Sequence, residues 1–182
     1  MPGKDGQFIQ TFSGRRVWPL SPAVEEICTE DIAHALSLQC RFTGHLKDFF
    51  SVAQHSVHVS FICDPADAFW GLMHDASEAY LIDLARPVKH HPEMAFFRIA
   101  EERLHAVIAE RFGLKLPIPF SVHVADDVML WTERRDLLPH VVSWASSKCV
   151  TLQTPLAEMI EPWPWERAER EFLKRFMEVG KW

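Results

Sequence analysis

Four ionisable side chains interrupt an otherwise apolar stretch over residues 70–83: His74, Asp75, Glu78 and Asp83. In an α-helix, Glu78 would lie one turn from both His74 and Asp75, so an imidazole and two carboxylates would share about one face. Buried carboxylates are costly unless a positive charge pairs with them. A metal ion meets that need, because it binds imidazole nitrogen and carboxylate oxygen together. The alternative is a solvated helix face with a chance His-Asp pair, so the flanking sequence has to decide.

Two other segments offer further metal ligands. A predicted helix over 51–62 begins at Ser51, a favourable N-cap, and carries His55 and His58 on neighbouring positions. Either histidine could bind a metal. Asp126 comes early in a helix predicted over 121–138, next to an apolar Val-Ala pair. Helix dipoles favour acidic residues in a first turn, which is the alternative explanation for this aspartate.

Composition and charge favour one packed globular domain. The chain has 182 residues, of which 48% are hydrophobic and 12% aromatic, enough for a single continuous core. Its formal net charge of −6 disfavours binding to long nucleic acid but allows a small phosphorylated ligand. Because no long apolar run and no signal-peptide pattern occur, we expect no membrane segment and a cytoplasmic location. The four cysteines are accordingly expected to be reduced.

The remaining patterns predict an all-α bundle of about six helices. Beyond the segments above, helices are predicted from 29 to about 40, over 93–112 and over 164–179, the first capped by Thr29 or Asp31. Residues 7–20 alternate weakly around Ser13-Gly14 and favour a short β-hairpin. Its Arg15 and Arg16 could touch a phosphate, although a solvated turn is the commoner role. Residues 133–136 indicate a solvated, charged helix face, and 139–162 an irregular segment.

Cations and one aromatic ring flank the acidic stretch. Arg86 and Lys89 follow it in a loop bent by two prolines, which brings both behind the carboxylates. Arg41 stands beside Phe42, an arrangement suited to a phosphate next to a nucleoside ring.

In combination, these motifs resemble the H…HD…D pattern of the HD-domain metal-dependent phosphohydrolases. Val52-Ala-Gln-His55-Ser is similar to the first-histidine motif of the nucleotidase branch, and Ala125-Asp126 to its last-ligand motif. His74-Asp75-Ala-Ser-Glu78, with Asp83-Leu-Ala-Arg86-Pro87-Val-Lys89, is similar to the signature that follows the HD pair. The resemblance covers about residues 29–138 of what we expect to be a single HD domain over 1–182. It departs from the family at Gln54, where many relatives have Glu, and at Phe42, where the nucleotidases have Trp.

The resemblance implies a site and a reaction. One divalent transition metal (Co, Mn, Zn, Fe or Ni) would be held by four residues: His55, His74, Asp75 and Asp126. Glu78 and Asp83 would act on the attacking water or the leaving oxygen, and the substrate would be bound by Arg41, Phe42, Arg86 and Lys89. The expected reaction is hydrolysis of a deoxynucleotide phosphate ester, with a dATP-like dNTP giving deoxynucleoside and triphosphate.

The alternatives concern both substrate and class. A 5'-deoxynucleotidase would break the same bond in a dNMP, so the metal site itself does not discriminate between the two. A non-catalytic HD protein that binds nucleotides and a purely structural helical module are the alternatives from other classes. The resemblance also implies a homodimer.

Overall fold

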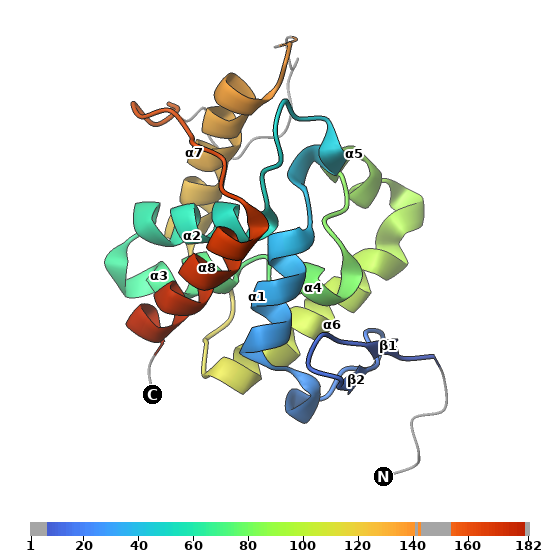
Figure 1. Ribbon diagram of the computed structural model, residues 1–182. Helices are drawn as coiled ribbons and strands as arrows, with labels where there is room; N and C mark the ends of the chain where they lie inside the picture. Colours follow the sequence, from blue (N-terminus) through green and yellow to red (C-terminus); the bar gives the residue numbers. More distant parts are fainter. Residues whose placement is uncertain (1–6, 141, 143–153, 181–182) are drawn as a thin grey trace.

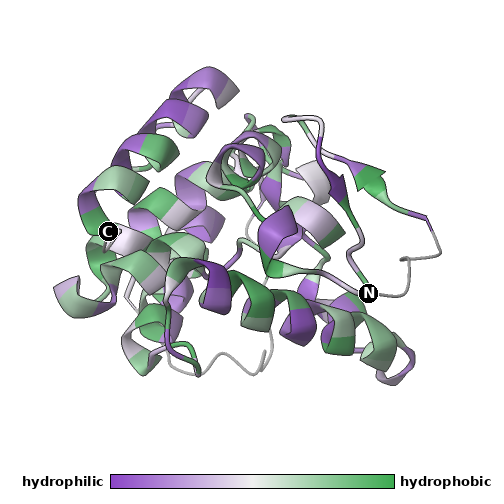
Figure 2. Cartoon of the chain, turned by 90° about the horizontal axis from the view of Figure 1, so that it is seen from below, coloured by the Kyte–Doolittle hydropathy of each residue, from purple (hydrophilic) through white to green (hydrophobic). Residues whose placement is uncertain are grey.

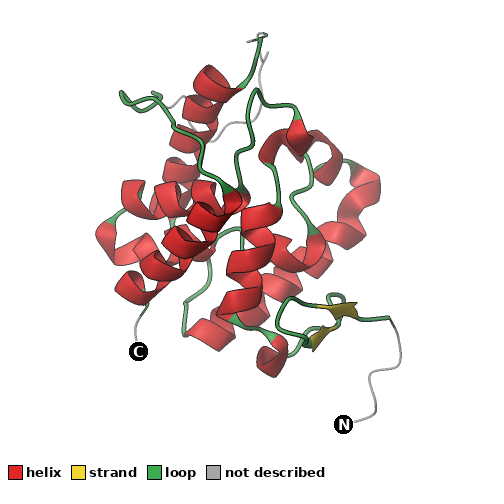
Figure 3. Cartoon of the chain, in the orientation of Figure 1, coloured by secondary structure: helices red, strands yellow, loops and turns green. Residues whose placement is uncertain are grey.

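The computed structural model describes residues 7–140, 142 and 154–180, and these are mostly helical (Figure 3). A two-stranded antiparallel hairpin, β1 (Ile9–Gln10) with β2 (Arg16–Val17), precedes the helices. The helices are α1 (Thr29–Leu38), α2 (Val52–Ile62), α3 (Ala68–Met73), α4 (Glu78–Leu81), α5 (Arg86–Lys89), α6 (Ala95–Phe112), α7 (Phe120–Leu137) and α8 (Trp165–Val179). The prediction of an all-α fold with a short N-terminal hairpin is confirmed.

Helix α2 lies at the centre of the bundle. It packs against α3, α7 and α8, while α8 also crosses α1 (Figure 1). All but one of the residues from Val52 to Ser60 are buried, so this helix has almost no side that faces solvent over that length. Around it, hydrophobic and hydrophilic residues alternate along the outer helices, as expected for amphipathic elements that share a core (Figure 2).

Local signals set some of the helix ends. The Ser51 side chain accepts a hydrogen bond from the backbone N–H of Gln54, so the predicted N-cap of α2 is confirmed. Gly113 ends α6 in the left-handed conformation, with φ 66°. The cap predicted for α1 is wrong: Cys28 occupies the N-cap, and Asp31 instead accepts bonds from the backbone N–H and hydroxyl of Ser13. Asp31 therefore anchors the hairpin to α1.

The continuous helix predicted over 70–83 is also wrong. Helix α3 ends at Met73, residues 74–77 form turns, and α4 is a single turn that begins at Glu78. Backbone N–H groups in this break bond three residues back, Ala76 to Met73 and Glu78 to Asp75, as in tight turns. The sequence pattern did not show that break, because the apolar spacing continues through it.

Several expectations concern residues that the structure covers only in part. Cys28, Cys40 and Cys63 are free thiols, and Cys149 lies outside the described residues. The irregular segment predicted over 139–162 also falls partly outside them. Among the helices that are described, none has the length and apolar character needed to cross a bilayer.

Candidate metal centre

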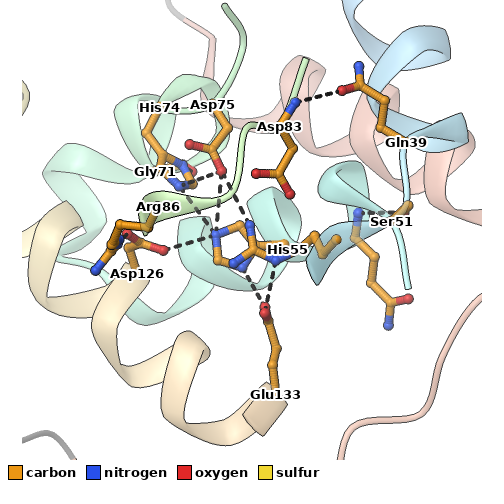
Figure 4. Close-up of polar contacts among 12 residues, drawn as sticks. Gln39, Ser51, His55, Gly71, His74, Asp75, Asp83, Arg86, Asp126 and Glu133 are labelled. Carbon is orange, nitrogen blue, oxygen red and sulfur yellow. Dashed lines mark hydrogen bonds and ion pairs between the residues drawn. The ribbon is translucent and has the colours of Figure 1, made fainter. Parts of the chain in front are cut away.

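Two histidines and two aspartates from three parts of the fold converge at the centre of the bundle (Figure 4). His55 comes from α2, His74 and Asp75 from the turn after α3, and Asp126 from α7. The Nε2 atom of His55 lies 3.3 Å from Nε2 of His74 and 3.2 Å from Oδ1 of Asp126. Oδ2 of Asp75 lies 3.2 Å from Nε2 of His74 and 3.6 Å from Nε2 of His55. The structure thus brings together all four predicted ligands.

The outer nitrogen of each imidazole is already committed as a donor. Nδ1 of His74 lies 2.8 Å from the carbonyl oxygen of Gly71, which can only accept, so Nδ1 carries the hydrogen. Nδ1 of His55 lies 2.6 Å from Oε1 of Glu133, a carboxylate that also accepts. When the rings are neutral, both Nε2 atoms point lone pairs at each other and at the aspartates. This arrangement needs a cation, either a proton or a metal ion.

The spacing of these atoms suits a transition metal. Ligand atoms about 2.0–2.2 Å from a common ion lie about 2.8–3.6 Å from one another in octahedral or tetrahedral geometry. The distances above fall in or at the edge of that interval. The group formed by His55, His74 and Asp75 could therefore hold a metal ion, with the Asp126 carboxylate beside it. Because His55 is 0% exposed while the side chains of Asp75 and Asp126 are 20% and 23% exposed, the carboxylate side is where a ligand could enter.

Electrostatics show how strongly these groups interact. Burial and the Arg41 charge lower the pKa of His55, but Glu133 and Asp126 outweigh them and raise it to about 9. Burial alone would raise the pKa of Asp75, but His74, His55 and Arg41 hold it well below its usual value. Asp126 behaves likewise, because its contact with His55 lowers its pKa despite burial. Both aspartates are thus ionised and ready to bind a cation.

The sequence analysis missed Glu133. This side chain is fully buried and bridges two residues of the site: Oε1 faces His55, and Oε2 accepts a 2.9 Å hydrogen bond from Nε of Arg41. The interpretation of 133–136 as a solvated face is therefore wrong, and Asp136 is buried as well. A signal was present, because Glu133 follows Asp126 by seven residues, two helical turns on the same face of α7. Carboxylates in this position commonly orient a metal-binding histidine.

The two predicted acid groups lie at the edge of the cluster. Glu78 is buried, and its Oε2 atom has no hydrogen-bond partner among the described residues. Burial, followed by the charges of Asp75 and Asp83, raises the pKa of Glu78 well above its usual value. Burial is also the largest effect on Asp83, whose pKa is raised in spite of Arg41. The Asp83 carboxylate points toward the cluster in Figure 4.

The predicted phosphate-binding cations are already engaged with acids. Arg41 is buried, bonded to Glu133 through Nε, and its NH1 lies 3.7 Å from Oδ2 of Asp75. Lys89 lies 2.5 Å from Oε1 of Glu101, and Arg86, half exposed, lies 3.4 Å from Oδ2 of Asp126.

Other candidates from the sequence lie apart from these contacts. The Phe42 ring lies 5.8 Å from the Arg41 guanidinium carbon, in a backbone with φ 53°. Arg15 bonds the carbonyl of Glu25, and Arg16 packs over Phe8, so both belong to the hairpin region.

His58 is turned away from the cluster. Its Nε2 lies 3.3 Å from Nε2 of Gln54, and its ring packs against Trp163. Burial and the nearby His55 lower the pKa of His58 to about 4. Of the two histidines on α2, His55 is therefore the one positioned to bind a metal. A cavity of about 490 Å³ between the end of α2 and the start of α7 is lined by Cys63, Phe120 and neighbours, but by none of the four cluster residues.

Comparisons with known proteins give relatives without an assigned role. No family model matches the chain. It is 45% identical over 130 residues to the uncharacterized protein YfdR of Escherichia coli K12, spanning 71% of this chain and 72% of that protein. It is 36% identical to the uncharacterized protein RCAP_rcc00048 of Rhodobacter capsulatus, spanning 64% of this chain and 65% of that protein. By its identity to YfdR and its coverage of that protein, the chain belongs to the YfdR family.

Proposed function

We propose that this protein is a metal-dependent phosphohydrolase of the HD-domain kind, formed by a single domain and acting on the phosphate ester of a deoxynucleotide. One observation carries the proposal: the Nε2 atoms of two imidazoles converge with the carboxylates of Asp75 and Asp126, beside a buried arginine. The metal would be one divalent transition ion among Co, Mn, Zn, Fe and Ni, because the ligands are nitrogen and oxygen without sulfur. When bound, it would acidify water and neutralise phosphate charge.

The side chains around the cluster would divide the remaining work. Arg41 is held at Nε by Glu133, so its terminal nitrogens can meet a phosphate oxygen in a fixed orientation. Glu78 would orient or deprotonate the attacking water, and Asp83 would share that role or protonate the leaving oxygen. The raised pKa values of both carboxyls support a role for them in proton transfer. Phe42, next to Arg41, would lie against the nucleoside.

The placement of cations bears on the length of the phosphate chain. A dNTP such as dATP carries a long anionic tail, and the expectation of a dNTP triphosphohydrolase rests on several cations surrounding it. In the described residues, Lys89 and Arg86 are each paired with an acid, while Arg15 and Arg16 are engaged at the hairpin. Arg41 and Arg86 border the cluster, and both are already paired with acids, which leaves few cations for a long phosphate tail and favours the 5'-deoxynucleotidase alternative with a dNMP substrate.

Product analysis by chromatography tests the proposal. Chelated protein would be loaded with Co²⁺ or Mn²⁺ and incubated with the four dNTPs, the four dNMPs and the matching ribonucleotides. Deoxynucleoside with triphosphate identifies the triphosphohydrolase, and phosphate released from dNMPs identifies the nucleotidase. The chelated protein is the control. Turnover that persists without metal, or no turnover of any compound while metal is bound, would contradict the proposal; nucleotide binding without turnover would favour the non-catalytic alternative.

Three linked expectations can be checked with the same preparation. Stoichiometric metal after purification separates a metal protein from a structural helical module, which would also keep its stability in chelator. Light scattering in solution tests the expected homodimer. Fractionation of expressing cells tests the expected cytoplasmic location.

A further inference from the structure

One short segment, from Glu78 to Asp83, contains a strained residue. Ile82 has φ 105° and ψ 149°, a region of backbone conformation occupied almost only by glycine. A β-branched side chain makes the strain greater, and Ile82 is 57% exposed, so burial of its own side chain does not offset it. Something else in the fold must hold the segment in this form.

Gln39 is the residue placed to do so. Its side-chain Nε2 donates to the carbonyl of Glu78 at 3.0 Å. Its Oε1 accepts from the backbone N–H of Asp83 at 3.1 Å (Figure 4). The two hydrogen bonds hold both ends of the strained segment, at Glu78 and at Asp83. The backbone carbonyl of Gln39 in turn accepts from the N–H of Val52, the first residue of α2. Gln39 therefore ties the segment to the start of the helix that carries His55.

The strained turn decides where Asp83 lies. If α4 continued as a helix, Asp83 would be rotated by about 140° from Glu78, because each residue advances about 100°. Instead the helix ends at Leu81, and the left-handed Ile82 turns the chain back. The carboxylates of Glu78 and Asp83 then act on each other and on Arg41.

We propose that Gln39 is a positioning residue, whose amide holds Ile82 in its strained conformation and so keeps Asp83 directed at the candidate metal centre. The role of Asp83 rests on the proposed function, but the mechanical part of the proposal does not. It can be tested in protein that is never given a substrate.

A stability cycle on the full chain is the first test. Ile82→Gly removes the strain, so we expect it to raise the melting temperature of the otherwise unchanged protein. In a Gln39→Leu background the segment can relax, so the same substitution should lose that gain. Val88→Gly is the matched control, because Val88 is also β-branched and 48% exposed but lies in the ordinary helix α5. It should lower the melting temperature equally in both backgrounds.

Hydrogen exchange supplies a residue-specific readout. In Gln39→Leu the amide of Asp83 loses its acceptor, so we expect its exchange to accelerate at least tenfold by NMR, with Co²⁺ affinity unchanged. Gln39→Glu, which keeps the acceptor but loses the donor to Glu78, should accelerate it less and serves if the leucine variant does not fold. The proposal is overturned if Ile82→Gly lowers the melting temperature as much as Val88→Gly does. It is also overturned if the exchange rate of the Asp83 amide is unchanged in Gln39→Leu. If the protein hydrolyses no nucleotide, the proposed function fails, but the melting temperatures and the exchange rates still decide whether Gln39 holds the strained segment.

Discussion

Replacing Glu133 with glutamine tests whether this buried carboxylate organises the metal centre. The glutamate accepts from His55 on one oxygen and from Arg41 on the other. Glutamine keeps one acceptor, but its amide N–H₂ would face whichever donor remains. In addition, the buried Arg41 charge loses its closest partner, since Asp75 stands farther away at 3.7 Å. The substitution therefore changes almost no volume and removes one negative charge.

The expected losses differ for stability and for metal binding. Breaking a buried ion pair by removing one partner costs about 3–5 kcal/mol of folding free energy. Loss of the partner that orients a metal-binding histidine weakens metal affinity by roughly 10- to 100-fold, or about 1.4–2.7 kcal/mol. Urea unfolding of the chelated protein measures the first effect, and calorimetric titration with Co²⁺ measures the second.

Asp136→Asn is the matched control, because it makes the same change from acid to amide in the same helix. Asp136 is also buried, but it binds Arg135 and the backbone N–H of Ile160 rather than the cluster. It should lower stability and leave Co²⁺ affinity as it was. The reasoning would be refuted if folded Glu133→Gln bound Co²⁺ within twofold of the unchanged protein, or if both variants lost affinity equally.

Three further perturbations follow from the structure. The pKa of His55 is raised to about 9 in the metal-free protein, so its contribution to stability is complete below about pH 6.5 and is lost as pH rises through 9. Co²⁺ displaces that proton, so its affinity should increase as pH rises over the same interval. Urea midpoints and Co²⁺ affinities that do not change with pH would contradict this. Gln54→Glu keeps the acceptor for the N–H of Trp163 but loses the 2.8 Å bond that Nε2 donates to the carbonyl of Glu161, so we expect about 1–3 kcal/mol less stability, and an unmoved urea midpoint would rule it out. Gly71→Ala would place Cβ 2.8 Å from Cα of Ser60, which is too close for two carbon atoms. Calorimetry should therefore show a melting temperature several degrees lower, corresponding to about 1–3 kcal/mol of stability. An unchanged melting temperature would show that α2 and α3 can move apart without cost.

The local sequence pattern predicted correctly those helix ends that depend only on nearby residues. Ser51 begins α2 as predicted, and the helices expected over 121–138 and 164–179 appear as α7 and α8 within a residue of those limits. Capping residues, prolines and apolar spacing act over one or two turns, so they can be recognised without the rest of the fold.

What could not be predicted depends on partners far away in sequence. Glu133 is buried only because α7 lies against α2, and the charged residues beside it made a solvated face the natural interpretation. Gln39 shows no unusual pattern in the sequence, yet its amide meets two backbone groups some forty residues away. The departure at Gln54 has a similar explanation: its Nε2 donates to the carbonyl of Glu161, which a glutamate could not do.

The position of α8 bears on the order in which the chain can mature during synthesis. Phe172 and Phe176 of α8 belong to the core that includes residues from α1 and α2. Gln54, next to His55, is bonded to the backbone of Trp163 just before α8. A nascent chain on the ribosome would therefore expose the inner faces of α1 and α2 until α8 emerges. All four candidate ligands are made well before α8, but we expect them to be held together, and an ion to be captured, only after α8 has left the ribosome.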